Sequence, residues 1–275
     1  MAKLLTANEP LQATAKSGPR LSAQSLDSRG RLVAVLSVDL AYKNYADVGA
    51  AVLERDQGLI QCQLVRIPLT GAPSPEALAE YLDRFCFREG IRLLLLDGPQ
   101  GWKAKDNGLR HSRQCERKLN TPAKTGEPMS VKPANYGVFV SFSIAVYDAL
   151  GARGWQRLST VGSALEPTRR ILIESFPLSA WRSLGIAPLP AKAKAQPADL
   201  ASRVAELQEL FPLRLSGTPT HDQLQAVVSG LAGLALEHNE WETCAVAGLP
   251  PALEEQYWRE GFIVNVVRPD PRDAV

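Results

Sequence analysis

The sequence predicts an α/β domain built on a mixed sheet, in which antiparallel strands come first, parallel strands follow, and helices flank the sheet. Three strand-like segments follow one another early in the chain, with a turn of Asp56, Gln57 and Gly58 between the second and the third. After them, amphipathic helical patterns alternate with short apolar runs typical of buried strands. Strands that alternate with helices indicate parallel crossover units, so we expect a meander followed by a parallel half.

Composition is that of an ordinary folded protein. The 275 residues are 45% hydrophobic and 22% charged, and the net charge of +2 is too small to indicate a nucleic-acid-binding surface over the whole molecule. No apolar run is long enough to cross a bilayer, so no membrane association is expected. The four cysteines form no CxxC pair and no metal-type spacing, which favours reduced thiols and a cytoplasmic location.

One folded domain is expected over residues 31–270. Residues 1–30 are rich in Ser, Ala, Gln and Gly and lack the apolar centre of a signal peptide, so we expect a flexible leader there. No internal repeat and no shift in composition divides the remainder.

The first half of the domain begins with three strands. The β-branched run at 31–41 predicts a buried strand that ends on Asp39. Residues 47–55 and 58–69 predict the two strands that follow it, separated by a turn of the kind found in hairpins. The simplest arrangement of the three is an antiparallel meander.

A helix and a central strand come next. The segment 74–90 begins with Ser74 as an N-cap, followed by proline at the first helical position, and it stops at Gly90. It leads into 91–97, which is apolar on both faces and ends on Asp97. A strand that is apolar on both faces is covered by helices on both sides, so this strand is expected near the centre of the sheet.

The second half repeats the alternation of helix and strand. Helices are expected over 136–154, 177–185, 198–211 and 218–239, strands over 169–177 and 261–269, and a linker over 186–197.

Between Gly98 and about Asn135 lies a long basic segment. It contains eight Lys and Arg residues but only three Asp and Glu residues. Within it, residues 107–120 predict a short helix. Long insertions in compact domains are usually functional or disordered. The segment is therefore either a phosphate-binding surface or a solvated loop with surplus lysines.

Four acids interrupt or end apolar elements: Asp39, Asp97, Glu174 and Asp222. Carboxylates are the ligands that Mg²⁺ and Mn²⁺ prefer, and acids clustered without a cation would raise one another's pKa. Two such ions can activate a water and stabilise the leaving oxygen of a phosphodiester. Taken singly, three of them have a ready structural interpretation: Asp39 and Asp97 suit loop hydrogen bonds, and Asp222 suits the first turn of a helix. Glu174 is harder to explain in this way, because glutamate is a poor turn former and is rarely buried unpaired.

The order of elements and acids resembles the ribonuclease H-like fold, here with a five-stranded mixed sheet and insertions. More narrowly, the blocks "SVDLA", "LLLLDGPQGW", "IESFPLSAWRSLG" and "HDQLQAVVSGLAG" resemble, in order, the family catalogued as domain of unknown function 429, over roughly 33–237. That family is regarded as predicted nucleases of the ribonuclease H-like superfamily.

The resemblance implies roles for the acids. Asp39 would bridge two Mg²⁺ or Mn²⁺ ions, and Asp97, Glu174 and Asp222 would complete the metal site. His221 would shuttle a proton or join the ligands. One departure from the family pattern is Gln225, which stands where relatives often carry a second helix acid.

Three basic residues are expected to contact the substrate. The resemblance places Arg113 and Arg117 in an arginine-containing insertion that would hold phosphate, and we expect Lys43, just beyond the first strand, to contribute as well.

Three functions are compatible with these features. The first is a metal-dependent nuclease that hydrolyses phosphodiester bonds in nucleic acid. The second is a catalytically inactive nucleic-acid-binding or scaffold protein of the same fold, which Gln225 and the modest net charge favour. The third, an actin-like ATP-dependent phosphotransferase, is disfavoured because Ala41, Tyr42 and Lys43 stand where that class carries a glycine-rich phosphate turn.

Overall fold

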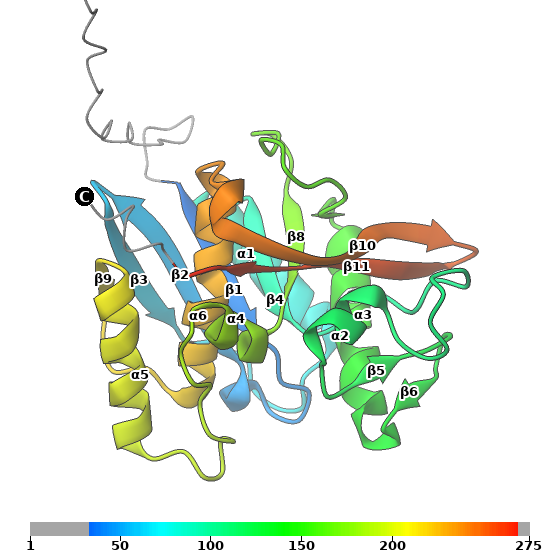
Figure 1. Ribbon diagram of the computed structural model, residues 1–275, viewed down its shortest axis with the longest axis horizontal. Coiled ribbons are helices and arrows are strands. Elements are labelled where there is room, and N and C mark those ends of the chain that lie inside the picture. Colours follow the sequence, from blue (N-terminus) through cyan, green and yellow to red (C-terminus); the bar gives the residue numbers. More distant parts are fainter. Residues whose placement is uncertain (1–32, 269–275) are drawn as a thin grey trace, which may run out of the picture.

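The computed structural model describes residues 33–268. The predicted leader at 1–30 lies outside the described residues. One large sheet runs through the described part of the chain, with helices on both faces (Figure 1). No helix among residues 33–268 has the length and apolar character needed to span a bilayer.

The strands of the large sheet are β1 (Ala34–Asp39), β2 (Gly49–Asp56), β3 (Leu59–Val65), β4 (Leu93–Asp97), β7 (Gln156–Arg157), β8 (Ile171–Ser175), β9 (Leu213–Leu215), β10 (Cys244–Glu254) and β11 (Tyr257–Val266). A separate small sheet consists of β5 (Lys124–Thr125) and β6 (Val131–Lys132). The helices are α1 (Pro75–Glu89), α2 (Gln114–Leu119), α3 (Gly137–Gly151), α4 (Pro177–Ser183), α5 (Pro197–Leu210) and α6 (His221–Glu237), with short 3-10 turns η1 (Tyr45–Asp47), η2 (Ala134–Tyr136) and η3 (Trp241–Thr243).

The predicted mixed sheet is confirmed. Strand order is β10-β11-β8-β4-β1-β2-β3-β9. β2 pairs antiparallel with both β1 and β3, whereas β4 pairs parallel with both β1 and β8. The five strands β3-β2-β1-β4-β8 are therefore the ribonuclease H-like arrangement expected from the sequence.

Four further strands enlarge this core to nine. β9 adds to β3, β7 adds to β8, and the long hairpin β10–β11 extends the other side, where it projects alongside α2 (Figure 1). β11 was expected from its apolar pattern. β10 was not expected, because Pro250 and Pro251 interrupt its sequence. The pairing of β10 with β11 shifts register between Leu249 and Ala252. An edge strand tolerates proline at such a bulge.

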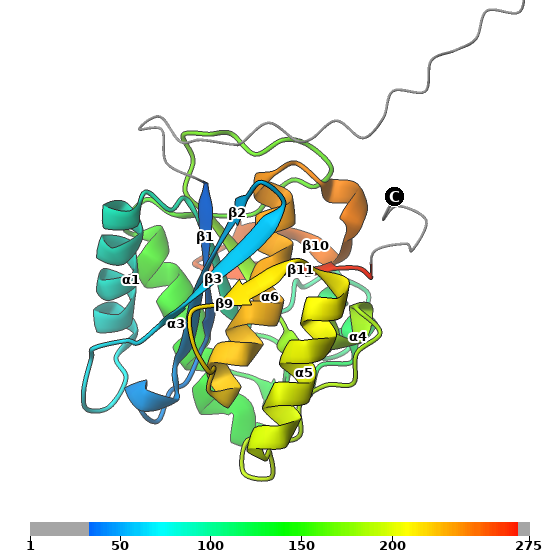
Figure 2. The ribbon, with the colours of Figure 1, turned by 90° about the vertical axis from the view of Figure 1, so that its left-hand side faces the viewer.

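The sheet separates two apolar cores. Side chains of successive strand residues point to opposite faces, so Leu93 and Leu95 pack under α6 while Leu94 and Leu96 pack under α1 and α3. Figure 2 shows the sheet edge-on, with α1 and α3 on one side and α4, α5 and α6 on the other. All four leucines are fully buried, which confirms the central position predicted for this strand.

Candidate active site

Asp39 and Asp97 are the last residues of two neighbouring parallel strands, β1 and β4, and stand directly opposite each other in the register. Equivalent residues of adjacent parallel strands point to the same face, so the pairing brings the two carboxyls together. The interaction between the two carboxyls raises the pKa of Asp39 and lowers that of Asp97. The strand register thus places these two candidate acids side by side at one edge of the sheet.

Both members of the pair are hard to ionise. Burial is the largest cause of a pKa of Asp39 well above its ordinary value, and the negative charges of Asp97 and Asp222 add to it against the opposing charge of Lys192. Burial likewise raises the pKa of Asp97 to about 7, because it outweighs the hydrogen bond from Asp39, and the charge of Glu174 adds a smaller increase. The pair thus shares a proton that a bound cation would displace.

A glycine allows α6 to approach this pair closely. Gly49, the first residue of β2, is in register with Asp39. A Cβ atom added to it would lie only 2.1 Å from the backbone carbon of Asp222, so no other residue fits without displacing the helix. Thr220 caps α6 by accepting a hydrogen bond from the backbone N–H of Gln223. Together these features hold Asp222, in the first turn of α6, beside Asp39.

The carboxylate of Asp222 already has two side-chain partners. Its Oδ2 contacts the ammonium of Lys192, and its Oδ1 lies 3.1 Å from Nδ1 of His221. The other ring nitrogen of His221, Nε2, lies 3.0 Å from the carbonyl oxygen of Pro190. Both ring nitrogens of His221 thus lie within hydrogen-bond distance of an oxygen acceptor. Burial acts to raise the pKa of Asp222, but the hydrogen bonds from His221 and Lys192 outweigh it and hold this pKa below its ordinary value.

Glu174 has other partners than the aspartates, although its charge acts on Asp97. It is in register with Leu96, one residue before Asp97, so its side chain leaves the sheet on the opposite face. There it makes two hydrogen bonds of 2.6 Å to the guanidinium of Arg113, and it accepts a third, of 3.0 Å, from the backbone N–H of Gln100. Burial raises the pKa of Glu174 in spite of these partners.

Arg113 is buried, with 1% of its side chain exposed. Besides Glu174, its guanidinium donates to Glu116 and Thr125, at 3.0 and 3.1 Å. The expected contact of Arg113 with substrate phosphate is therefore not what this structure shows: its donors face protein carboxylates and a hydroxyl.

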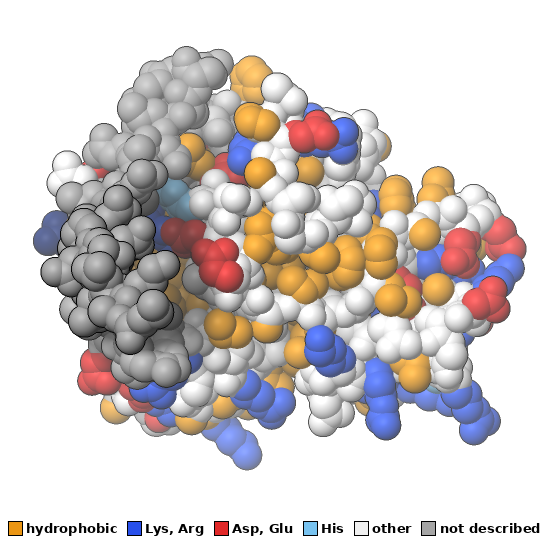
Figure 3. Space-filling view, turned by 45° about the horizontal axis from the view of Figure 1, so that its top comes forward, with side chains coloured by type: hydrophobic (Ala, Val, Ile, Leu, Met, Phe, Trp, Pro, Cys, Tyr) orange, Lys and Arg blue, Asp and Glu red, His pale blue; other side chains and the backbone are white. Residues whose placement is uncertain are grey.

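The other two predicted phosphate contacts are exposed. Arg117 lies on the outer side of α2, and the ammonium of Lys43 lies 5.5 Å from the centre of the Tyr42 ring. Several neighbouring cations of the basic segment have partners within the protein: Lys105 pairs with Glu255 at 2.6 Å, and Lys118 donates to the carbonyl of Val246. Figure 3 shows Lys and Arg side chains along the lower edge of the molecule in that view. Acidic and basic side chains are mixed at the end where the β10–β11 hairpin lies. The exposed cations of the segment are Lys105, Arg110, Arg117, Lys118 and Lys132.

A small cavity adjoins the aspartate pair. It has a volume of about 180 Å³, and its lining includes Asp97, Glu174 and Ser175. Ser175 is opposite Asp97 in the register, so Asp39, Asp97 and Ser175 form one row across three strands. The Ser175 hydroxyl is buried and has no hydrogen-bond partner among the described residues. An orphaned buried hydroxyl beside two carboxyls fits a site that takes a polar ligand.

Gln225 takes no part in this cluster. Its side-chain oxygen accepts a hydrogen bond of 2.7 Å from the indole N–H of Trp181, a residue of α4. The side chain of Gln225 therefore contributes to the packing of α6 against α4.

Among residues 33–268, no group of three or more His, Cys, Asp and Glu side chains has the geometry of a metal site. The four-acid cluster expected from the sequence is thus not assembled. A pair of carboxylates nonetheless fits one Mg²⁺ or Mn²⁺ ion, because such ions keep several waters and are commonly held by one or two carboxylates together with substrate phosphates. Asp39 and Asp97 have the donor chemistry for that role.

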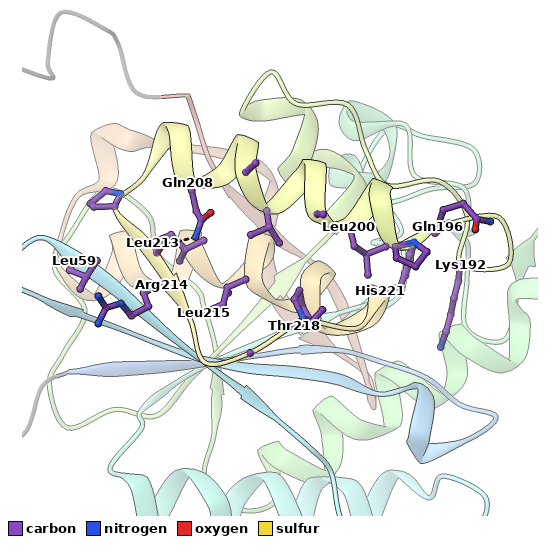
Figure 4. Close-up of a pocket in the computed structure, with 18 residues that line it drawn as sticks. Leu59, Lys192, Gln196, Leu200, Gln208, Leu213, Arg214, Leu215, Thr218 and His221 are labelled. Atoms are coloured by element: carbon purple, nitrogen blue, oxygen red, sulfur yellow. Dashed lines mark hydrogen bonds between the residues drawn. The ribbon is translucent and has the colours of Figure 1, made fainter.

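A long groove reaches the same region from the far edge of the sheet. It has a volume of about 1040 Å³ and lies between α5 and β9. In Figure 4, Leu59 and Arg214 mark one end and Lys192 and His221 the other. Most of its lining is apolar, so it differs in chemistry from the aspartate pair that it approaches.

Lys192, Gly49 and Ser175 belong to the site and were not anticipated. Lys192 lies in a segment whose alanines, lysines and prolines indicate a linker. Nothing in that pattern distinguishes Lys192 from Lys194, and a serine or glycine at a strand end carries no signal of its own. Their roles come from the positions of strands and loops in space.

The shared proton makes stability depend on pH. The pKa values of Asp39 and Asp97 lie above the value of about 3.9 of an unfolded aspartate, so the folded state binds more protons than the unfolded chain between about pH 4 and 7. We therefore expect the pair's contribution to the free energy of unfolding to fall as pH rises through this window, by about 1.4 kcal/mol per unit of pKa displacement. Urea unfolding of metal-free wild type and Asp97→Asn at several pH values measures it. Parallel profiles for the two proteins would contradict the shared proton.

Comparisons with known proteins find no matching family model and no matching curated protein. Among solved structures, the chain is similar to Thermus thermophilus RuvC, alone and in complex with a Holliday junction substrate, with 11% identity and TM-scores of 0.37. These similarities cover 74% of this chain and 95% and 94% of the two RuvC chains. A human cytomegalovirus terminase nuclease domain is also similar, with 11% identity, a TM-score of 0.24, and coverage of 75% of this chain and 77% of that one. Membership in a particular family stays a prediction.

Proposed function

We propose that the chain is a metal-dependent nuclease that hydrolyses phosphodiester bonds in nucleic acid, in the cytoplasm, and that it belongs to the family catalogued as domain of unknown function 429. The observation that carries this proposal is the Asp39–Asp97 pair at the ends of β1 and β4, where two carboxyls face each other and share a proton. Without a ligand, the two carboxyls resist ionising together, because two negative charges so close would repel each other. A divalent cation would turn the repulsion into attraction.

The residues around the pair have distinct parts in the proposal. Asp39 and Asp97 would hold one Mg²⁺ or Mn²⁺, which activates water and neutralises charge on the reacting phosphate when bound. Ser175 supplies a hydroxyl in the same row of the sheet. Asp222 holds the His221 ring through Nδ1, and an imidazole held at this edge of the site could transfer a proton during the reaction.

Nucleic acid would approach over the basic segment. Exposed Arg117 and Lys43 provide phosphate contacts that are independent of sequence. Arg113 and Glu174 have a different part, because they neutralise each other beneath this surface and hold the insertion against the end of β8.

The proposal is tested by incubating the purified full chain with Mn²⁺ or Mg²⁺ and labelled single-stranded, duplex and branched DNA and RNA. We expect cleavage of at least one substrate, no cleavage with EDTA, and recovery when the metal is restored. Cleavage that persists in EDTA would exclude a metal-dependent site. Absence of cleavage on every substrate, together with absence of Mn²⁺ binding by calorimetry, would reject the proposal.

The second candidate, a nucleic-acid-binding or scaffold protein without activity, is favoured by one observation. Asp222 and Glu174 are already compensated by protein cations, so only two of the four acids remain for a metal. Nucleic-acid binding by a protein that takes up no Mn²⁺ would establish this alternative.

A further inference from the structure

The ammonium of Lys192 lies between carboxylates from two separate elements. The lysine comes from the loop between α4 and α5, and its Nζ contacts Oδ2 of Asp222 in the first turn of α6 and, at 2.6 Å, Oδ1 of Asp47 in η1. These partners differ in exposure: 11% of the Asp222 side chain is accessible, against 47% for Asp47. The lysine therefore reaches inward from the surface to the edge of the aspartate cluster.

The charge of Lys192 acts on Asp39 as well. It favours the ionised form of Asp39, whereas Asp97 and Asp222 both disfavour it. Two carboxylates, those of Asp47 and Asp222, thus contact one ammonium group, whose charge also acts on Asp39. A hard divalent cation placed there would interact with the same oxygens.

We propose that Lys192 occupies the position of a second cation, so that the site takes one divalent ion, between Asp39 and Asp97, rather than two. The inference rests on the proposed function, since it concerns how many ions the same site holds. It differs from the prediction from the sequence, in which Asp39 would bridge two metal ions. The physical reason is that both oxygens of Asp222 are engaged, one by Lys192 and one by His221.

Removing the ammonium should open a second site. In Lys192→Ala, Oδ2 of Asp222 and Oδ1 of Asp47 lose their cationic partner, and Asp39 loses the charge that favours its ionised form. Carboxylates left without compensation attract a divalent ion. Lys192→Arg keeps a cation at this place and should leave the number of ions unchanged.

The test is calorimetric titration of metal-free protein with MnCl₂ near neutral pH. We expect one equivalent for wild type, two for Lys192→Ala and for Lys192→Met, and one for Lys192→Arg. Lys194→Ala is the matched control, since Lys194 is an exposed lysine of the same loop. Electron paramagnetic resonance gives an independent readout, because two Mn²⁺ ions held close together couple magnetically and a single ion does not.

The outcomes separate this inference from the proposed function. Two equivalents in wild type, or a single equivalent in folded Lys192→Ala and Lys192→Met, would overturn the role of Lys192 and leave a metal-dependent nuclease intact. No binding by wild type would overturn the proposed function and this inference with it. Circular dichroism shows whether each variant is folded.

Discussion

Asp97→Asn is expected to lower the rate of metal-dependent phosphodiester cleavage more than about 100-fold. Loss of a residue that only hydrogen-bonds to a metal ligand typically lowers metal affinity or activity 10- to 100-fold, and Asp97 supplies one of the two carboxylates of the proposed site. An amide keeps the size of the side chain but carries no charge to attract the ion. Initial rates at saturating Mn²⁺, together with a Mn²⁺ titration, measure the effect.

The same substitution should stabilise the metal-free protein. The amide introduced by Asp97→Asn would donate a hydrogen bond to Asp39 and remove a second buried acid whose pKa is raised to about 7. Activity and stability should therefore change in opposite directions, which a variant that merely misfolds cannot do. Asp106→Asn is the control, since Asp106 is exposed. Full activity in Asp97→Asn would show that Asp97 is not a ligand.

Arg113→Ala is expected to lower the free energy of unfolding by about 3–5 kcal/mol, the loss typical when one partner of a buried ion pair is removed. Only 3% of the Glu174 side chain is exposed, and both of its oxygens lie 2.6 Å from the guanidinium of Arg113. Glu116 would lose a partner as well. Urea unfolding measures the change. Arg113→Lys should recover little of it, because a single ammonium cannot reproduce a two-point contact.

Arg117→Ala separates structural from substrate roles in the insertion. Arg117 is exposed on α2, four residues from Arg113. We expect this variant to keep its stability within about 0.5 kcal/mol, and to bind nucleic acid more weakly with a shallower dependence on salt. If Arg113→Ala instead kept full stability and lost nucleic-acid affinity, the buried pair would be a minor contributor and Arg113 a phosphate contact.

Local patterns were sufficient for most of the elements. Ser74 caps α1 and Gly90 ends it with a positive φ of 71°, as the sequence predicts. The apolar strand 91–97 lies at the centre of the sheet because it is buried on both faces. β9 and β10 could not be predicted in the same way, since β9 has only three residues and β10 carries two prolines.

The meeting of Asp39 and Asp97 follows from sequence reasoning. Each ends an apolar strand, and the ends of neighbouring parallel strands lie at one edge of a sheet. The separation of Glu174 does not follow. Its position one residue before the strand end sends it to the opposite face, and only the register with β4 makes that visible. The residue that lies in the row with Asp97 is therefore Ser175 and not Glu174.

The sequence by itself therefore determined the order of the five core strands and of the main helices, and the two aspartates at strand ends, because hydrophobic period, caps and strand ends are local properties. The tertiary structure alone decided which acids are free to hold a cation. Arg113 and Glu174 are 61 positions apart, and Lys192 and Asp222 are 30 apart. Coulomb attraction depends on distance in space, and no local pattern specifies which distant cation will lie against which carboxylate.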